Sequence, residues 1–304
     1  METLDAWAPG VKEVAARHGV RMVSLSRFVK GENPVFNINE NVVVKLLPHG
    51  SAHLALREIE CLKWLTRCKT VPVPTLLGSG QIEDWNYLIS TKLPGRLLSE
   101  QWAELGEVDQ ETLATELGQL LAALHKVPLE GFCPGGVRWR DFLLNGTASW
   151  IERPSVTRLP ARLRDSGIEY IANAQLNQYD HLTVFLHGDL APENCLVSAT
   201  DGSWHVAGIF DFGNAMAGHT LFDFTALTVL MAPGNARVLK RLFEGYGIVG
   251  NLSVDLRRQL MAYTLLHPLG DISQILRLIP GLDRCTSWDE VAQAFWPIFA
   301  MPLS

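Results

Sequence analysis

A short polar loop between two apolar runs constrains this chain most. The loop reads HGDLAPEN over residues 187–194, and an apolar, strand-like run lies on each side of it. Seventeen residues after Asn194, the second of two strand-like runs ends in IFDFG, which places Asp211 at the end of a strand. An Asp-Gly pair at 201–202 separates these runs and predicts a tight β-hairpin turn. The hairpin would bring Asn194 and Asp211 to the same end of one ribbon.

Three side chains at this end of the ribbon form a candidate site. Carboxylate and amide oxygens are hard ligands, so Asn194 and Asp211 predict a Mg²⁺ site that is shared with phosphate oxygens. Asp189 lies at the start of the loop, where its carboxylate could accept a proton from a hydroxyl nucleophile. The alternative interpretation is a plain connector, because turns also favour Gly, Pro, Asn and Asp.

Two upstream residues supply the other half of the candidate site. Lys45 lies in the β-branched run NVVVKLL, where an unpaired ammonium would be costly. Glu58 lies on the apolar stripe of a helix predicted over 52–66, in one row with Leu62 and Leu65. If the helix packs on the strand, the two charges satisfy each other and Lys45 faces the phosphates of a nucleotide. A lysine that snorkels to solvent and a solvated helix-edge glutamate are the alternatives.

Strand patterns dominate the first third of the chain and helical patterns dominate the rest. Residues 22–47 alternate as strands, and a hairpin that ends at Thr91 follows the first long helix. Pro94 and Gly95 then interrupt the pattern. We therefore expect a strand-rich lobe over 1–93 and a larger helical lobe over 94–304.

Within the second lobe the periodicity predicts three kinds of segment. An amphipathic helix is expected over 110–125, with its leucines on one face. Residues 131–160 are rich in Trp, Gly and Pro and are expected to be irregular. Further helices are predicted over 161–178 and from about residue 222 to the end.

The composition is that of an ordinary globular protein, with 47% hydrophobic and 19% charged residues. The net charge of −6 and the lack of a basic stripe argue against nucleic acid as a partner. Five cysteines without a C-x-x-C pair favour neither a disulfide framework nor a zinc site, and they suit a reducing cytosol. The N-terminal residues lack a signal-peptide pattern, and no apolar run approaches a membrane span. A cytoplasmic protein without membrane contact is expected.

The order of these motifs resembles the eukaryotic-kinase-like fold and, within it, the aminoglycoside phosphotransferase and choline-kinase group. This group carries His-Gly-Asp where protein kinases carry His-Arg-Asp, and the resemblance extends from about residue 20 to residue 230. It implies a two-lobed α+β fold. The small N-terminal lobe would be an antiparallel sheet that binds the nucleotide. The larger, mainly helical C-terminal lobe would hold the catalytic and acceptor-binding residues.

The resemblance also implies a role for each motif residue. Asp189 corresponds to the catalytic base, and Asn194 and Asp211 correspond to Mg²⁺ ligands. Lys45 corresponds to the lysine on the α- and β-phosphates of the nucleotide, and Glu58 corresponds to its partner.

Other motifs extend the resemblance. KGENPVF, residues 30–36, resembles the phosphate-covering loop although it has one glycine, and it implies that Gly31 and Asn33 also bind the nucleotide. Asp223 in GHTLFDF matches an aspartate with a structural role. Trp139 and Asp141 are candidates for lining an acceptor pocket, with core packing as the alternative. The isolated histidines, His125 and His181 among them, are interpreted as helix-end or surface residues, whereas His187 is expected to fix the catalytic loop by hydrogen bonding.

These implications define a small-molecule kinase that uses ATP, or GTP, with Mg²⁺. Only eleven residues lie between Asp211 and Asp223, with no Ala-Pro-Glu signature, which disfavours a protein kinase. The expected acceptor is a hydroxyl of a cationic, aminoglycoside-type antibiotic, because the family and the acidic balance both favour a polycation. Such an enzyme would confer resistance. Acidic residues of the helical tail are candidates for the cation pocket, with a solvated acidic face as the alternative: Asp255, Asp271, Asp283, Asp289 and Glu290.

Two other functions stay open at this point. One is a metabolic kinase for an amino alcohol, a sugar or a hydroxylated amino acid. The other is a nucleotide-binding pseudokinase that acts as a scaffold, which is disfavoured because Lys45, Asp189, Asn194 and Asp211 are all present. Either a monomer or a homodimer fits the sequence.

Overall fold

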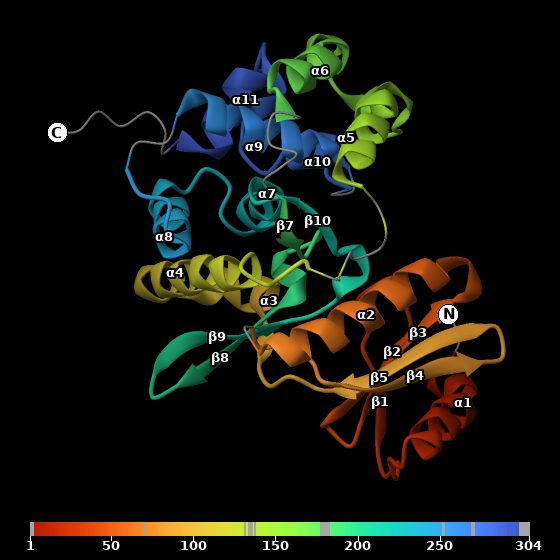
Figure 1. The fold of residues 1–304 in the computed structure, drawn as a ribbon. Coiled ribbons are helices and arrows are strands. Elements are labelled where there is room, and N and C mark those ends of the chain that lie inside the picture. Colours follow the sequence, from red (N-terminus) through yellow and green to blue (C-terminus); the bar gives the residue numbers. More distant parts are fainter. Residues whose placement is uncertain are drawn as a thin grey trace.

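The chain forms two lobes in the computed structural model (Figure 1). The structure describes residues 3–69, 71–130, 132, 136, 138–176, 183–250, 253–268 and 271–297. A small lobe contains an antiparallel sheet, and a larger lobe consists mainly of helices, so the predicted fold class is confirmed. Among the described helices, none combines the length and apolarity that a membrane crossing requires.

The small lobe is a five-stranded sheet in the order β1-β2-β3-β5-β4, with two helices packed on it. Its strands are β1 (Leu25–Arg27), β2 (Val35–Ile38), β3 (Val42–Pro48), β4 (Leu76–Ile82) and β5 (Trp85–Thr91). Its helices are α1 (Leu4–Arg17) and α2 (Ala52–Cys68). The predicted strands over 22–47, the helix over 52–66 and the hairpin ending at Thr91 are confirmed.

Alternation along β3 decides which helix each side chain meets. Val44 and Leu46 belong to one apolar cluster with residues of α1, whereas Leu47 belongs to another with Ala55 of α2. Successive side chains of a strand point to opposite faces. Lys45 therefore lies on the α2 face of the sheet, which is the face that the sequence pattern required of it.

The large lobe packs its helices around one extended core. Its helices are α3 (Leu98–Gln101), α4 (Glu107–Leu124), α5 (Trp139–Ala148), α6 (Ala161–Asn173), α7 (Leu221–Met231), α8 (Ala236–Tyr246), α9 (Val254–Leu266), α10 (Ile272–Ile275) and α11 (Trp288–Phe295). Helix α7 is almost entirely buried, and it lies at the centre of the lobe in Figure 1.

Two further small sheets lie outside the five-stranded sheet. In one, β7 (Thr183–Leu186) pairs with β10 (Met216–His219). In the other, β6 (Arg96–Leu97) pairs with β8 (Cys195–Thr200), and β8 pairs with β9 (Ser203–Ile209). Strands β8 and β9 are the predicted hairpin, and Asp201 and Gly202 take positive φ angles of 52° and 83° in its turn.

The prediction of an irregular segment over 131–160 is wrong in part, because α5 occupies its middle. Trp139 and Leu143 share one face of this helix and are buried, so tertiary packing stabilises a segment whose Gly146 weakens the local signal. The predicted helices over 110–125 and in the tail are present. The helix predicted over 161–178 ends at Asn173. Residues 177 and 178 of the prediction lie outside the described part of the chain, as do His181 and Leu182.

Candidate active site

Lys45 of β3 joins two carboxylates that come from distant parts of the chain. Its Nζ donates to Glu58 Oε2 of α2 at 2.8 Å and to Asp211 Oδ1 at 2.7 Å. The side chains of Lys45 and Glu58 are almost fully buried, with 8% and 5% of the residue exposed. The structure therefore brings together the strand lysine, the helix glutamate and the aspartate of the IFDFG motif.

The charges of this cluster hold one another in place. Burial by itself would lower the pKa of Lys45, but the Glu58 and Asp211 carboxylates outweigh it and raise that pKa above its usual value. Burial would raise the pKa of Asp211, and the adjacent Lys45 overcomes this effect and lowers it. Burial raises the pKa of Glu58, against the pull of Lys45. Lys45 is therefore a fixed cation at neutral pH, with Asp211 as its anionic partner.

The polar loop that contains Asp189 is fixed by its own histidine. The Nε2 atom of His187 lies 3.0 Å from the carbonyl oxygen of Phe210, and its Nδ1 accepts the backbone N–H of Asp189 at 3.3 Å. Since a carbonyl oxygen only accepts, the proton of the neutral ring is on Nε2. The histidine thus ties the loop to the end of β9.

A buried carboxylate holds the same loop from behind. Asp223, in the first turn of the central helix α7, accepts the backbone N–H groups of His187 at 2.8 Å and Gly188 at 2.9 Å. Gly188 has a φ of +80°, and a Cβ there would overlap the carbonyl oxygen of Asn214. Glycine is therefore required in the second position of the loop.

Asp189 has the environment of a proton acceptor. Burial raises the pKa of its carboxyl, and the negative charge of Asp211 adds to this effect, while His187 and Asn214 oppose it. A carboxylate with a raised pKa is a better general base than a free one. Asn214, which follows the IFDFG motif directly, is a contact of Asp189 that the sequence prediction missed.

Asn194 and Asp211 lie at the same end of the β8–β9 hairpin. Asn194 ends the 3₁₀ turn Pro192–Asn194, and its Nδ2 donates to the backbone oxygen of Asp189 at 2.8 Å, which leaves its amide oxygen as the available donor atom. Its backbone oxygen accepts the N–H of Phe210 at 3.1 Å, so the hairpin places Asn194 beside Asp211. A carboxylate and an amide oxygen are hard ligands that suit Mg²⁺. The side chains present therefore fit this metal.

Among the described residues, Gly31 and Asn33 are not hydrogen-bonded to the charged cluster. Both are in the bend between β1 and β2, and within the described chain neither donates or accepts a hydrogen bond with Lys45, Glu58 or Asp211. Gly31 has a φ of +104°, a conformation that favours glycine. Their nucleotide contacts stay a prediction.

The acidic residues of the helical tail are mostly engaged with groups of the protein itself. Asp271 caps α10 and pairs with Arg158 at 2.8 Å. Asp289 pairs with Arg258, which also lies 3.8 Å from Asp255, and Glu290 accepts hydrogen bonds from Thr286. Asp283 lies exposed beside a groove of about 350 Å³. The structure thus favours the solvated and capping alternative over a preformed cation pocket.

The aromatic residues singled out in the sequence belong mostly to the core. Trp139 is buried against Phe222 and Tyr263, and Asp141 pairs with Arg138 on the surface at 2.9 Å. The packing alternative therefore holds for Trp139. Trp150, Trp288 and Trp296 are also buried, whereas Trp204 is half-buried.

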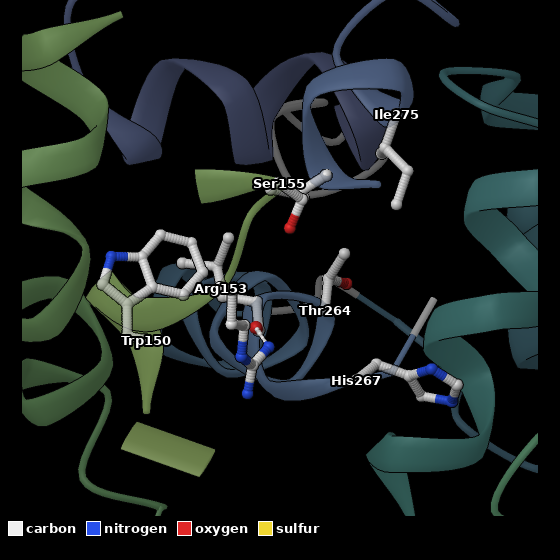
Figure 2. Close-up of a pocket in the computed structure, with 8 residues that line it drawn as sticks. Trp150, Arg153, Ser155, Thr264, His267 and Ile275 are labelled. Atoms are coloured by element: carbon white, nitrogen blue, oxygen red, sulfur yellow. Dashed lines mark hydrogen bonds between the residues drawn. The ribbon is translucent and has the colours of Figure 1, made fainter. Parts of the chain in front are cut away.

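A small cavity between α9 and α10 lies apart from the cluster of Lys45, Glu58 and Asp211. In Figure 2 the Arg153 side chain lies beside the Trp150 ring, and it donates to the backbone oxygens of Leu265 and Gly146. The cavity holds about 10 Å³, which is room for about one water molecule. Arg153 thus acts as a tie between segments of the helical lobe, and the cavity is too small for an acceptor.

Comparisons with known proteins show the family of this chain. A family model described as the phosphotransferase enzyme family matches residues 26–263, which is most of the chain. The chain is 26% identical over 174 residues to an aminoglycoside 3'-phosphotransferase of Streptomyces fradiae, covering 55% of this chain and 60% of that protein. It is also 21% identical over 284 residues to lysine-specific demethylase JMJ21 of Arabidopsis thaliana, covering 75% of this chain and 30% of that protein. The chain thus spans 60% of the length of the first of these relatives and 30% of the length of the second.

Solved structures show the same fold. The structure of APH(2")-IIIa with GDP and kanamycin matches with a TM-score of 0.68 at 18% identity, covering 94% of this chain and 96% of that one. The fold is thus that of solved phosphotransferases. The chain belongs to the phosphotransferase enzyme family. The predicted family and enzyme class are confirmed.

Removal of one member of the buried ion pair should cost more stability than removal of both. Lys45→Met leaves the Glu58 carboxylate buried without a cation, and we expect a loss of about 3–5 kcal/mol in the free energy of unfolding. The double variant Lys45→Met/Glu58→Leu should regain most of that stability, because the buried Glu58 carboxylate is gone and the Asp211 side chain, which is 40% exposed, can be solvated, yet it should stay inactive. Urea unfolding and a phosphoryl-transfer assay on the wild type and both variants provide the test. Equal stability of the single and double variants would contradict the pairing.

Proposed function

We propose that this enzyme transfers the γ-phosphoryl group of ATP or GTP to a hydroxyl of an aminoglycoside-type acceptor, with Mg²⁺ as its metal. The observation that carries the proposal is the Lys45 ammonium, which lies between Glu58 and Asp211 and so beside the predicted metal ligand. The names of similar proteins support the acceptor class, since one is an aminoglycoside 3'-phosphotransferase and another was solved with kanamycin. Both GDP and ATP complexes occur among the structural neighbours.

Each residue has one task in the proposed reaction. Lys45 binds oxygens of the α- and β-phosphates, and Glu58 keeps its ammonium oriented. Asn194 and Asp211 would hold Mg²⁺, which, when bound, supplies positive charge against the phosphate oxygens. Asp189 orients the acceptor hydroxyl and takes its proton as the acceptor oxygen bonds to the γ-phosphorus. The bond between that phosphorus and the bridging oxygen breaks, and the nucleoside diphosphate leaves with the electron pair.

The lobes divide this work. We place nucleotide binding in residues 1–93, with Gly31 and Asn33 above the phosphates, and catalysis and acceptor binding in 94–304. The small-molecule acceptor then enters from the helical side of Asp189. A cytoplasmic monomer or homodimer fits this arrangement, because every proposed catalytic group comes from one chain.

A metabolic acceptor is the second candidate. The ion pairs of the acidic tail residues favour this candidate. Asp271 and Asp289 are paired with arginines and are not free to bind an ammonium group of the acceptor. An amino alcohol, a sugar or a hydroxylated amino acid needs fewer anionic contacts than a polycation. A pseudokinase scaffold is disfavoured, because Lys45, Asp189 and Asp211 are present and two of them are in contact.

Substitution of the proposed base should abolish transfer without loss of the nucleotide. Asp189→Ala should lower kcat by about 10²–10⁴, the usual contribution of a positioned acid–base group. Its affinity for the nucleotide should stay within a few-fold of the wild type, because Lys45 and Asp211 are untouched. Steady-state kinetics and calorimetric nucleotide titration measure the two quantities. A kcat within tenfold of the wild type would remove Asp189 from the mechanism.

The two proposed metal ligands should differ in their effect. Asp211→Asn should raise the Mg²⁺ concentration at half-maximal activity strongly, because an amide carries no charge to offset a divalent ion. Asn194→Ala removes a neutral ligand and should raise it less. Mg²⁺ titrations of activity at fixed nucleotide provide the comparison. Unchanged Mg²⁺ dependence in both variants would show that the hairpin does not hold the metal.

Salt dependence should separate a polycationic acceptor from a neutral one. Attraction between exposed charges is screened beyond about 8–10 Å at physiological ionic strength. The KM for an aminoglycoside should therefore rise steeply with salt, while the KM for the nucleotide, which is held by buried contacts, should rise much less. A panel of aminoglycosides, amino alcohols and neutral sugars would be assayed at several salt concentrations. Turnover of a neutral sugar alone, without this asymmetry, would favour the metabolic acceptor.

A further inference from the structure

Hydrogen bonds behind the catalytic loop continue beyond Asp223 to the outer helix α8. Asp223 Oδ2 lies 3.2 Å from Nε2 of His125, the C-cap residue of α4. The other ring nitrogen of His125, Nδ1, lies 2.9 Å from the hydroxyl of Tyr246, the last residue of α8. His125 is buried, so it is a helix-end histidine, as expected, but not a surface one.

The direction of each hydrogen bond in this series follows from its two ends. Burial would raise the pKa of Asp223, but His125 and its other partners lower it, so its carboxylate is an acceptor only. His125 must then present N–H at Nε2, and its Nδ1 must accept. Tyr246 can donate to Nδ1 at all ordinary pH, because burial raises the pKa of its phenol to about 12. The hydroxyl of Thr220 interacts with the same phenol oxygen.

Helices α4 and α8, next to which His125 and Tyr246 meet, pack closely against each other. A Cβ on Gly118 of α4 would overlap the carbonyl oxygen of Leu242, and a Cβ on Gly245 of α8 would overlap that of Thr115. The rings of His125 and Tyr246 meet edge to face, with their centroids 5.5 Å apart. Close backbone contact of this kind leaves little room for Tyr246 to move away from His125.

We propose that Tyr246 is a positioning residue for phosphoryl transfer: its hydroxyl donates to Nδ1 of His125 and so holds the ring where Nε2 donates to Asp223, which keeps Asp223 on the backbone of the catalytic loop. The proposal rests on the proposed function in one respect, the role of Asp189. Without the Tyr246 hydroxyl, the buried Nδ1 of His125 has lost the donor that fixes the ring. The ring then turns, and its hydrogen bond to Asp223 weakens. Asp223 moves, and the amides of His187 and Gly188 lose their anchor.

The kinetic test is Tyr246→Phe, which removes only the hydroxyl. At pH 8 we expect kcat to fall about 3- to 10-fold, the usual effect of one hydrogen bond, with the KM values of nucleotide and acceptor unchanged.

The remaining titratable groups near this series are the same in both proteins. His219 of β10 interacts with His125, and His187 and His267 interact with Asp223. The substitution leaves these groups unchanged, so the comparison of variant with wild type isolates the Tyr246 hydroxyl. Tyr170→Phe is the matched control, because Tyr170 is a buried tyrosine of α6 in the same lobe and is outside the series. Its kcat should equal that of the wild type.

A measurement without turnover keeps the inference independent of the acceptor. The ¹⁵N chemical shifts of His125 in the wild-type protein, assigned with a His125→Gln variant, should report protonated Nε2 and unprotonated Nδ1. The Nδ1–H tautomer would overturn the inference even if phosphoryl transfer is confirmed. An unchanged kcat in Tyr246→Phe, or a loss that appears in the KM values and not in kcat, would overturn it as well. If no acceptor is ever turned over, the proposed function fails while the tautomer result still stands.

Discussion

One buried ammonium connects the parts of this molecule that must act together. Lys45 comes from the sheet, Glu58 from the helix that packs on the sheet, and Asp211 from the end of a hairpin in the larger lobe. An unpaired charge in that position would destabilise the fold by several kcal/mol, so helix, sheet and hairpin must meet there. The same contact places a cation beside the carboxylate that we propose as a metal ligand. One arrangement therefore meets the requirement for stability and the proposed requirement for binding phosphate.

Much of this arrangement is predictable from the sequence because it depends on local rules. Lys45 faces α2 because side chains alternate along a strand, and Glu58 faces β3 because it continues an apolar helical row. Asn194 and Asp211 meet because an Asp-Gly turn sets the hairpin between them, with Cys195 opposite Ile209. Each rule involves residues within one or two adjacent elements, which is the range in which sequence patterns are informative.

The features that escaped prediction depend on long-range contacts. Helix α5 is stabilised by burial of Trp139 and Leu143, although its local sequence favours irregular structure. The sequence predicted a possible cation pocket at the tail carboxylates, because it does not reveal that Arg158 and Arg258 lie beside two of them. Contacts between residues more than one hundred positions apart, such as that between His125 and Tyr246, have no periodic signature. The clustering of Lys45, Glu58 and Asp211 was therefore predictable, and the pairing of the tail carboxylates with arginines was not.

The central claim is that Lys45 and Asp211 together form a metal-dependent site for a nucleoside triphosphate. Isothermal titration of the wild-type protein with non-hydrolysable analogues of ATP and GTP, each with Mg²⁺ and with a chelator in its place, tests this claim most directly. The account predicts saturable binding of at least one analogue at a single site, with a large loss of affinity when Mg²⁺ is removed. Absence of binding by both analogues, or equal affinity with and without Mg²⁺, would contradict it.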